Sequence, residues 1–177
     1  GGPGGPGGGP RGFGGGGMRG TFMQAGLFHT YRLEDEILIA SGIPALYLLN
    51  GDATGGNGGV SRHEIRLQGG VTHNGMGVRM GATWRSATTV DSGADALHFS
   101  DLATVNLRLF ANLGMQRKLA AKMPFLRGAR ISIGIDNLFN QRQRVTDSSG
   151  ATPLGFQPAY LDPLGRTVSI RFRKLFF

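Results

Sequence analysis

Residues 166–173 read RTVSIRFR, and from Thr167 onward the side chains alternate strictly between polar and apolar. Val168, Ile170 and Phe172 alternate with Ser169 and Arg171. A period of two places successive side chains on opposite faces of an extended chain, so this pattern predicts a β-strand with one apolar and one polar face.

The same alternation recurs in other segments of the chain. It is clearest in residues 104–109 (TVNLRL) and 130–136 (RISIGID), and it recurs in residues 64–72 and 78–85. Residues 21–39 are also strand-like, although the alternation is blurred around Leu27-Phe28. These segments predict an all-β fold of about six antiparallel strands. The pattern contains no convincing amphipathic helix, and residues 115–126 are expected to form at most a short helical turn, cut by Pro124.

The predicted connections alternate between short and long. His73-Asn74-Gly75 is a tight hairpin signal, because Asn-Gly tolerates positive φ. Longer polar stretches follow at Ala40–Gly59, Ala87–Leu97 and Asn140–Gly165. This asymmetry is typical of outer-membrane barrels, although Gly114–Gly128 is long where a short turn is expected. Soluble β-sandwiches alternate in the same way, so the pattern alone leaves both classes open.

Composition excludes several other classes. Only 17% of the residues are charged, the net charge is +8, and cysteine is absent, so disulfides and thiolate metal sites are excluded. No apolar run of about 18 residues predicts a transmembrane helix. The sequence contains no signal peptide and starts in a glycine tract, and we therefore expect a fragment of a longer protein.

Gly1–Gly20 is rich in glycine and proline, and we expect a flexible linker there, with the β-strand region spanning residues 21–177. Arg11, Phe13 and Arg19 lie among the glycines, and the same mixture of arginine, aromatic residues and glycine occurs in RNA-binding segments rich in arginine and glycine. A soluble RNA-binding protein with a β-domain is therefore the alternative hypothesis.

Two C-terminal segments resemble the last strands of TonB-dependent outer-membrane receptors. Residues 128–140 (GARISIGIDNLFN) resemble the penultimate strand, which ends in an Asn-Leu-Phe motif, and residues 161–172 (LDPLGRTVSIRF) resemble the final strand, which is entered through Gly-Arg. The aromatic end of the chain resembles the signal read by the barrel assembly machinery. The residues that carry the resemblance are Asn137, Leu138, Phe139, Gly165, Arg166, Phe172, Phe176 and Phe177. The terminal aromatic is expected at Phe176, so Phe177 implies either a bulge near Lys174-Leu175 or a residue beyond the strand.

The resemblance, to a subgroup with a Gly/Pro-rich insert, implies a transmembrane barrel of about 22 strands closed around a plug domain. This chain would supply roughly a quarter of the wall. The family is bacterial and energised by TonB through the plug, and it imports siderophore-bound iron, cobalamin or glycans. Expected partners are outer-membrane lipid, the plug of the same protein, TonB and the assembly machinery. No cofactor, nucleic acid or enzymatic activity is implied.

Strand parity, counted back from a periplasmic carboxyl terminus, predicts which end each connection occupies. The three long connections are expected outside the cell, and the hairpin, residues 114–128 and the glycine tract on the periplasmic side. The barrel hypothesis predicts that Val105, Leu107, Ile131, Ile133, Val168 and Ile170 face lipid. The RNA-binding hypothesis predicts that they form a dry core.

Seven arginines are expected on the polar face, which would line the lumen: Arg66, Arg79, Arg85, Arg108, Arg130, Arg171 and Arg173. They would either favour an anionic cargo or, as we prefer, pair with plug carboxylates and with wall acids such as Glu64 and Asp136.

The remaining polar residues predict no catalytic or metal site. His29, His63, His73 and His98 lack metal-ligand spacing, and Asp91, Asp95 and Asp101 lack catalytic spacing. Glu34-Asp35-Glu36 is expected at a solvated rim, where a divalent ion is the alternative. Tyr31 and Trp84 suit an aromatic girdle.

Overall fold

The computed structural model describes residues 20–52, 58–91 and 96–176. The expectations for residues 1–19, Asp95 and Phe177 lie outside these ranges. Strands dominate the described chain, so the all-β prediction is confirmed. Within the described ranges, no helix is long and apolar enough to cross a lipid bilayer.

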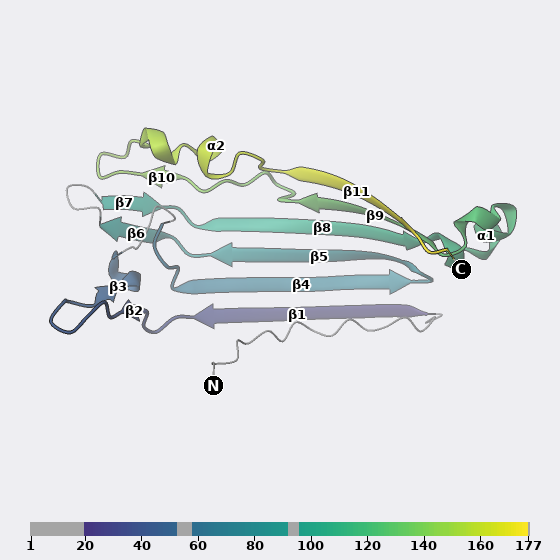
Figure 1. The fold of residues 1–177 in the computed structure, drawn as a ribbon, viewed down its shortest axis with the longest axis horizontal. Coiled ribbons are helices and arrows are strands. Elements are labelled where there is room, and N and C mark those ends of the chain that lie inside the picture. The colour runs from purple at the N-terminus through teal and green to yellow at the C-terminus, as the bar shows by residue number, and fades with distance from the viewer. Residues whose placement is uncertain (1–19, 53–57, 92–95, 177) are drawn as a thin grey trace.

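Six long strands form one antiparallel sheet in the order β1-β4-β5-β8-β9-β11. Each of them pairs with the next of the six along the chain, as in a meander (Figure 1). Between each two neighbouring strands, the paired residues follow one another without a break. The bounds are β1 (Thr21–Tyr31), β4 (His63–His73), β5 (Met76–Arg85), β8 (Leu102–Asn112), β9 (Ala129–Asp136) and β11 (Thr167–Lys174). The expected strand over residues 21–39 is shorter than predicted, because β1 ends at Tyr31.

One end of the sheet, the short-turn end, carries the tight hairpin between β4 and β5. Asn74 and Gly75 have φ angles of 48° and 79°, the left-handed pair that a two-residue hairpin requires. The start of β1 and the end of β11 lie at this same end (Figure 1). The connection from β8 to β9 also lies here and holds the expected helical turn, as η2 (Leu113–Met115), α1 (Arg117–Lys122) and η3 (Pro124–Leu126).

The opposite end, the long-connection end, carries all three long connections (Figure 1). They are more ordered than the sequence predicts. They contain a two-stranded sheet and a three-stranded sheet in the order β10-β7-β6. The bounds are β2 (Glu36–Ile37), β3 (Leu46–Tyr47), η1 (Leu48–Asn50), β6 (Thr88–Asp91), β7 (Ala96–Phe99), β10 (Val145–Thr146), η4 (Leu154–Phe156) and α2 (Pro158–Leu161).

A small hydrophobic core joins two of the long connections. Val90, Phe99 and Val145 are buried, and Leu97 and Phe156 pack against them. The rings of Phe99 and Phe156 meet edge to face with centroids 5.7 Å apart. The connection from β5 to β8 and the connection from β9 to β11 therefore form one packed unit beyond the end of the long strands. The Asp91 amide also donates a hydrogen bond to the Gly51 carbonyl of the first connection.

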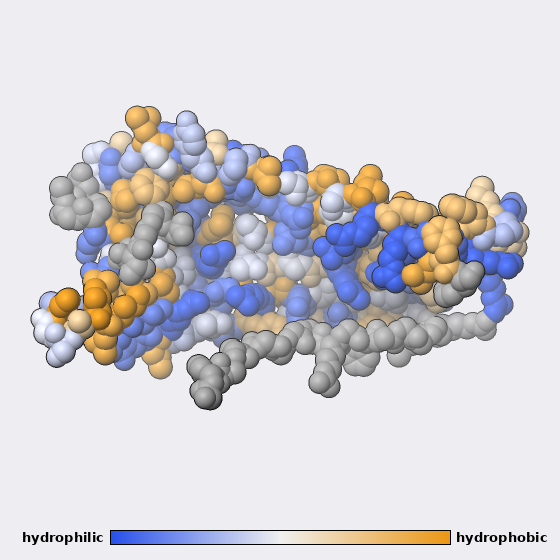
Figure 2. Space-filling model, viewed as in Figure 1, coloured by the Kyte–Doolittle hydropathy of each residue, from blue (hydrophilic) through white to orange (hydrophobic). Residues whose placement is uncertain are grey.

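The register divides the main sheet into two unlike faces. Directly paired residues share a face, so one row across the sheet runs through residues 24, 70, 79, 108, 134 and 169, which are Gln, Gly, Arg, Arg, Gly and Ser. The adjacent row runs through residues 25, 69, 80, 107, 135 and 168, which are Ala, Gly, Met, Leu, Ile and Val. We call these the polar face and the apolar face. Figure 2 looks onto the polar face, where hydrophilic side chains cover much of the middle of the sheet.

The apolar face of the sheet is not buried. Leu27, Val168 and Ile170 are 69%, 65% and 72% exposed, and Ile133 is also exposed. Val105, Leu107 and Ile131 are half-buried. Among the described residues, no second layer packs against this face. The dry core that the RNA-binding hypothesis requires is therefore not found there.

Candidate functional site

The polar face carries all seven arginines named from the sequence. Arg79 pairs directly with Arg108, and Arg173 pairs directly with Arg130. Arg66, Arg85 and Arg171 fall on the same face because they lie an even number of residues from a member of its row. The alternation in the sequence thus placed these residues on one surface, and the identity of what that surface faces stays a prediction.

Four of these arginines lie close together toward the short-turn end, and two of them flank one phenylalanine. We call Arg79, Arg108, Arg130 and Arg173 the arginine cluster. The guanidinium carbons of Arg79 and Arg130 lie 5.4 and 4.6 Å from the centroid of the Phe110 ring. Phe110 is buried on this polar face. Cation–π attraction of about 0.5–1 kcal/mol per contact helps to hold these two guanidinium groups beside the ring.

A glycine makes room for the Phe110 ring. Gly77 pairs with Phe110 across the sheet. A Cβ atom on Gly77 would lie 2.6 Å from Cζ of Phe110 and 2.7 Å from the carbonyl oxygen of Val71. The absence of a side chain at position 77 therefore sets the position of the ring. The sequence pattern missed this contact, because it depends on the pairing register of two strands.

Acidic residues do not neutralise the arginine cluster. The salt bridges of the described chain both involve Glu64, whose carboxylate lies 2.6 Å from Arg66 and 3.6 Å from Arg32. The predicted pairing of Glu64 is thus present, whereas Asp136 makes no ion pair among these residues. Arg79 lies directly opposite Arg108, and Arg130 lies directly opposite Arg173. Like charges in this arrangement repel each other, and neither pair has an acidic partner in the described chain. Such a surface attracts anions.

The Asn-Leu-Phe motif forms a hydrogen-bonded turn at the end of β9. The side chain of Asn137 accepts a hydrogen bond from the Gln141 amide (2.9 Å) and donates one to the Gln141 carbonyl (2.7 Å). The Asn137 amide in turn donates to the side-chain oxygen of Asn106 at 2.9 Å, and the Leu138 amide donates to the Val105 carbonyl at 2.7 Å. The motif thus anchors the chain to β8 as it leaves the sheet.

The Gly-Arg pair meets the same turn. The Arg166 amide donates to the side-chain oxygen of Asn140, and its guanidinium donates to the Leu138 carbonyl. Gly165 has a φ of 56° and packs so closely on Asn140 that a Cβ atom would clash. The two motifs therefore join the entrance of β11 to the exit of β9.

The aromatic members of the motif set are exposed. Phe172 lies on the apolar face, and Phe139 and Phe176 are 63% and 83% exposed. Pairing with β9 is regular up to Lys174, which leaves no bulge before that residue. The strand ends there, and Leu175 donates one further hydrogen bond to the Gly128 carbonyl.

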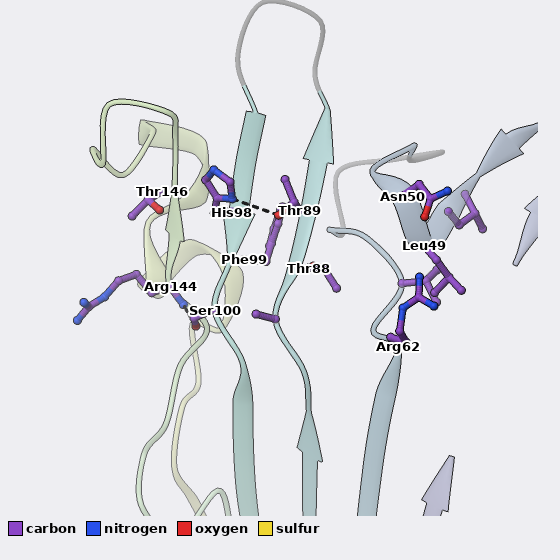
Figure 3. A pocket seen from close by; sticks show the side chains of 13 residues that line it. Leu49, Asn50, Arg62, Thr88, Thr89, His98, Phe99, Ser100, Arg144 and Thr146 are labelled. Atoms are coloured by element: carbon purple, nitrogen blue, oxygen red, sulfur yellow. Dashed lines mark hydrogen bonds between the residues drawn. The ribbon is translucent and has the colours of Figure 1, made fainter. Parts of the chain in front are cut away.

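A cavity of about 480 Å³ lies among the long connections. Leu49 and Asn50 of η1 stand on one side of it, with Thr88, Thr89 and Phe99 of the three-stranded sheet on the other (Figure 3). Its lining is mixed, with two arginines, hydroxyl groups and apolar side chains. His98, one of the four histidines considered from the sequence, belongs to this lining and forms a hydrogen bond with Thr89 at 3.1 Å.

The other histidines and the aromatic residues also occupy identifiable positions. His29 and His63 stack with centroids 5.4 Å apart, and Tyr31 lies against His63. Trp84 donates to Asp101 at 2.9 Å. His29, Tyr31, His63 and Trp84 belong to the apolar face near its long-connection end. In the part of the chain that the structure describes, no three acidic or histidine residues form a metal-binding group. The acidic run at residues 34–36 separates β1 from β2 and extends into β2.

Substitution of Gly77 by alanine tests the close packing of the Phe110 ring against Gly77. The new Cβ atom displaces the ring or the β4–β5 pairing, and we expect a loss of about 1–3 kcal/mol in the free energy of unfolding. Urea titration of the refolded protein measures this loss. Gly81→Ala is the matched control, because it lies on the same face of the same strand with open space around it. Equal stability of the two variants would contradict the packing argument.

Substitution of Asn137 tests the motif turn. Asn137 has a φ of 52° and is buried. Asn137→Ala adds backbone strain of about 1–2 kcal/mol to the lost hydrogen bonds, whereas Asn137→Gly loses only the bonds. We expect alanine to destabilise the protein more than glycine in urea titrations. Phe139→Ala is the control and should change stability by less than about 0.5 kcal/mol. The reverse order of alanine and glycine would refute this account.

The turn after β10 should depend on pH. The hydroxyl of Ser149 and the amides of Ser149 and Ala151 donate to Asp147, and these hydrogen bonds hold the pKa of Asp147 below its usual range. The resulting stabilisation is complete above the ordinary aspartate pKa of about 4 and is lost as pH falls through the lowered value. The protection of the Ser149 amide against hydrogen exchange, relative to the intrinsic rate at each pH, should fall with this loss. Asp147→Asn should abolish the pH dependence of that protection.

No protein-family model matches this sequence, and no curated protein or solved structure is significantly similar to it.

Proposed function

We propose that this chain forms the C-terminal part of the wall of a TonB-dependent transporter in the bacterial outer membrane. The observation that carries the proposal is the pairing of an uncovered apolar face with an arginine-rich polar face on one sheet. In water, such an apolar surface is unfavourable in proportion to its area. Against acyl chains it is favourable, and the polar face then borders a water-filled lumen.

The dimensions of the sheet support this proposal. Its strands are 8 to 11 residues long, close to the roughly 9–11 residues that span a bilayer when tilted. The tight hairpin and the long connections lie at opposite ends, as in outer-membrane barrels. In the described sheet, β1 and β11 each have one free edge. Free edges are not tolerated in lipid, so further strands of the same protein would pair with them.

The arginine cluster has a role in this proposal. Lumen charges ordinarily find partners, and the described wall offers the cluster no carboxylate. Carboxylates of a domain that fills the barrel would supply the missing charge. An anionic cargo, such as a ferric chelate, is the second candidate for the same surface, and its entry would require that domain to move.

The motif turn adds specific support. Asn137, Asn140 and Gly165 each hold left-handed backbone conformations, and they lie within one hydrogen-bonded unit that joins β9 to β11. Four of the residues that carry the resemblance to TonB-dependent receptors therefore share a structural role: Asn137, Leu138, Gly165 and Arg166.

Paired cysteine substitutions test the membrane orientation. These 177 residues contain no cysteine, so each new thiol is the only one among them, and the full-length protein without either substitution gives the background reaction. Ser169 and Ile170 are neighbours on β11 and lie on opposite faces. In outer membranes that contain the full-length protein, we expect Ser169→Cys to react with a water-soluble maleimide. Ile170→Cys should react much more slowly and should be quenched by a lipid-attached nitroxide when it carries a fluorophore.

The outcomes separate the two hypotheses. Equal maleimide reaction at both positions, or recovery of the protein in the soluble fraction, would refute the transporter proposal. Saturable binding of single-stranded RNA by that soluble protein would establish the alternative. The positions are adjacent in sequence, so differences in expression or depth do not explain a difference between them.

A further inference from the structure

Charge is segregated along the length of the main sheet. All 11 acidic residues of the sequence fall within residues 34–64, 91–101 and 136–162. Those described belong to the long connections or to strand ends at that end of the sheet. The three lysines of the chain, Lys118, Lys122 and Lys174, all lie at the short-turn end.

The connection between β8 and β9 carries much of this positive charge. Its helix α1 buries Ala120 and half-buries Leu119, and it leaves Arg117, Lys118 and Lys122 exposed. Lys118 and Lys122 are four residues apart, so they lie on the same side of the helix. Residues 113–128 contain no acidic side chain.

Exposed apolar side chains accompany these cations. Met123 and Phe125 follow the helix and are 55% and 65% exposed. Lys174 lies 5.6 Å from the centroid of Phe125 and 5.5 Å from that of Phe176, and it donates a hydrogen bond to the Arg127 carbonyl. In Figure 2, hydrophobic and hydrophilic side chains lie side by side at the end where Figure 1 places α1. We call these residues the basic rim: Arg117, Lys118, Lys122, Met123, Phe125, Arg127, Lys174 and Phe176.

The basic rim continues the apolar face. Lys174 shares that face with Phe172 and Ile170, and it is the last residue of β11. The order along the face is therefore aliphatic side chains, then aromatic rings, then ammonium groups. A bilayer has the same order of acyl chains, interface and phosphates, and lysine stems can extend along apolar surface toward that interface.

We propose that the basic rim binds the phosphate groups of anionic phospholipids. This inference rests on the proposed membrane function. Charge complementarity favours this occupant, because the rim holds five cations and no carboxylate, and its exposed Phe125 and Met123 contact the interface. An acidic protein would neutralise the charge but would leave the adjacent apolar side chains of the strand end in need of a separate cover.

A lipid titration tests this proposal. The full-length protein in neutral detergent is titrated with phosphatidylglycerol or with phosphatidylcholine, and bound lipids are counted by native mass spectrometry. We expect tighter binding of phosphatidylglycerol. Each basic residue near a membrane surface contributes roughly a fivefold preference, so Lys118→Gln/Lys122→Gln should weaken phosphatidylglycerol binding by about 25-fold.

The matched control removes two cations from the other end of the sheet. Arg62 and Arg144 line the cavity among the long connections, and Arg62→Gln/Arg144→Gln should leave phosphatidylglycerol binding unchanged. Circular dichroism should show the same strand content in all three proteins, because the substituted side chains of α1 are exposed.

The possible results distinguish this inference from the function on which it rests. Equal binding of the two lipids by the unchanged protein would overturn the lipid inference and leave the transporter proposal standing. Failure to bind either lipid would overturn both. Displacement of phosphatidylglycerol by inorganic phosphate at similar concentration would identify a simple anion site and would also overturn it. An equal loss of phosphatidylglycerol binding in the two double variants would show that binding is not local to the basic rim, and this result too would overturn the lipid inference.

Discussion

Unbroken antiparallel pairing is the constraint on which the rest of this structure depends. Because paired residues share a face and the side-chain period is two, a slip of one residue would exchange the two faces. All six long strands keep the same phase, from Gln24 on β1 to Ser169 on β11. The arginine cluster and the apolar face are thus two results of one register. The tight Asn74-Gly75 turn helps to fix that register, since a two-residue connection leaves little freedom for sliding.

The sequence predicts the long strands well because each has a repeated local signal. In β9, three isoleucines alternate with polar or small residues, and no tertiary information is needed to assign its faces. The three-stranded sheet was not predicted, because β10 is only Val145–Thr146 and its partner is Phe99, more than forty residues away. A two-residue strand has no period to detect. Its buried side chains are recognisable only once two connections that are distant in sequence are brought together.

The candidate site was likewise predicted only in part. Alternation in the sequence located its arginines, whereas the packing of Phe110 against Gly77 depends on which residues of β5 and β8 lie opposite each other. The motif placed Asn137 at the end of a strand, whereas its hydrogen bonds to Gln141 depend on the path of the chain after β9. The groups that neutralise the arginine cluster cannot be found from these residues. In the described sheet, Glu64 binds Arg66 and Arg32, and Asp136, the other acid of the polar face, makes no ion pair.

The free edges of β1 and β11 have a further consequence for handling this chain in water. Within the sheet that the structure describes, each edge presents unpaired backbone groups, and the adjoining apolar face exposes residues such as Met23 and Ile170. A second copy can satisfy the first edge by adding its own strand and can cover the apolar face by stacking on it. Both contacts repeat indefinitely, so growth does not stop at a dimer. Outside a lipid or detergent environment, this sheet is therefore a template for fibrous aggregation.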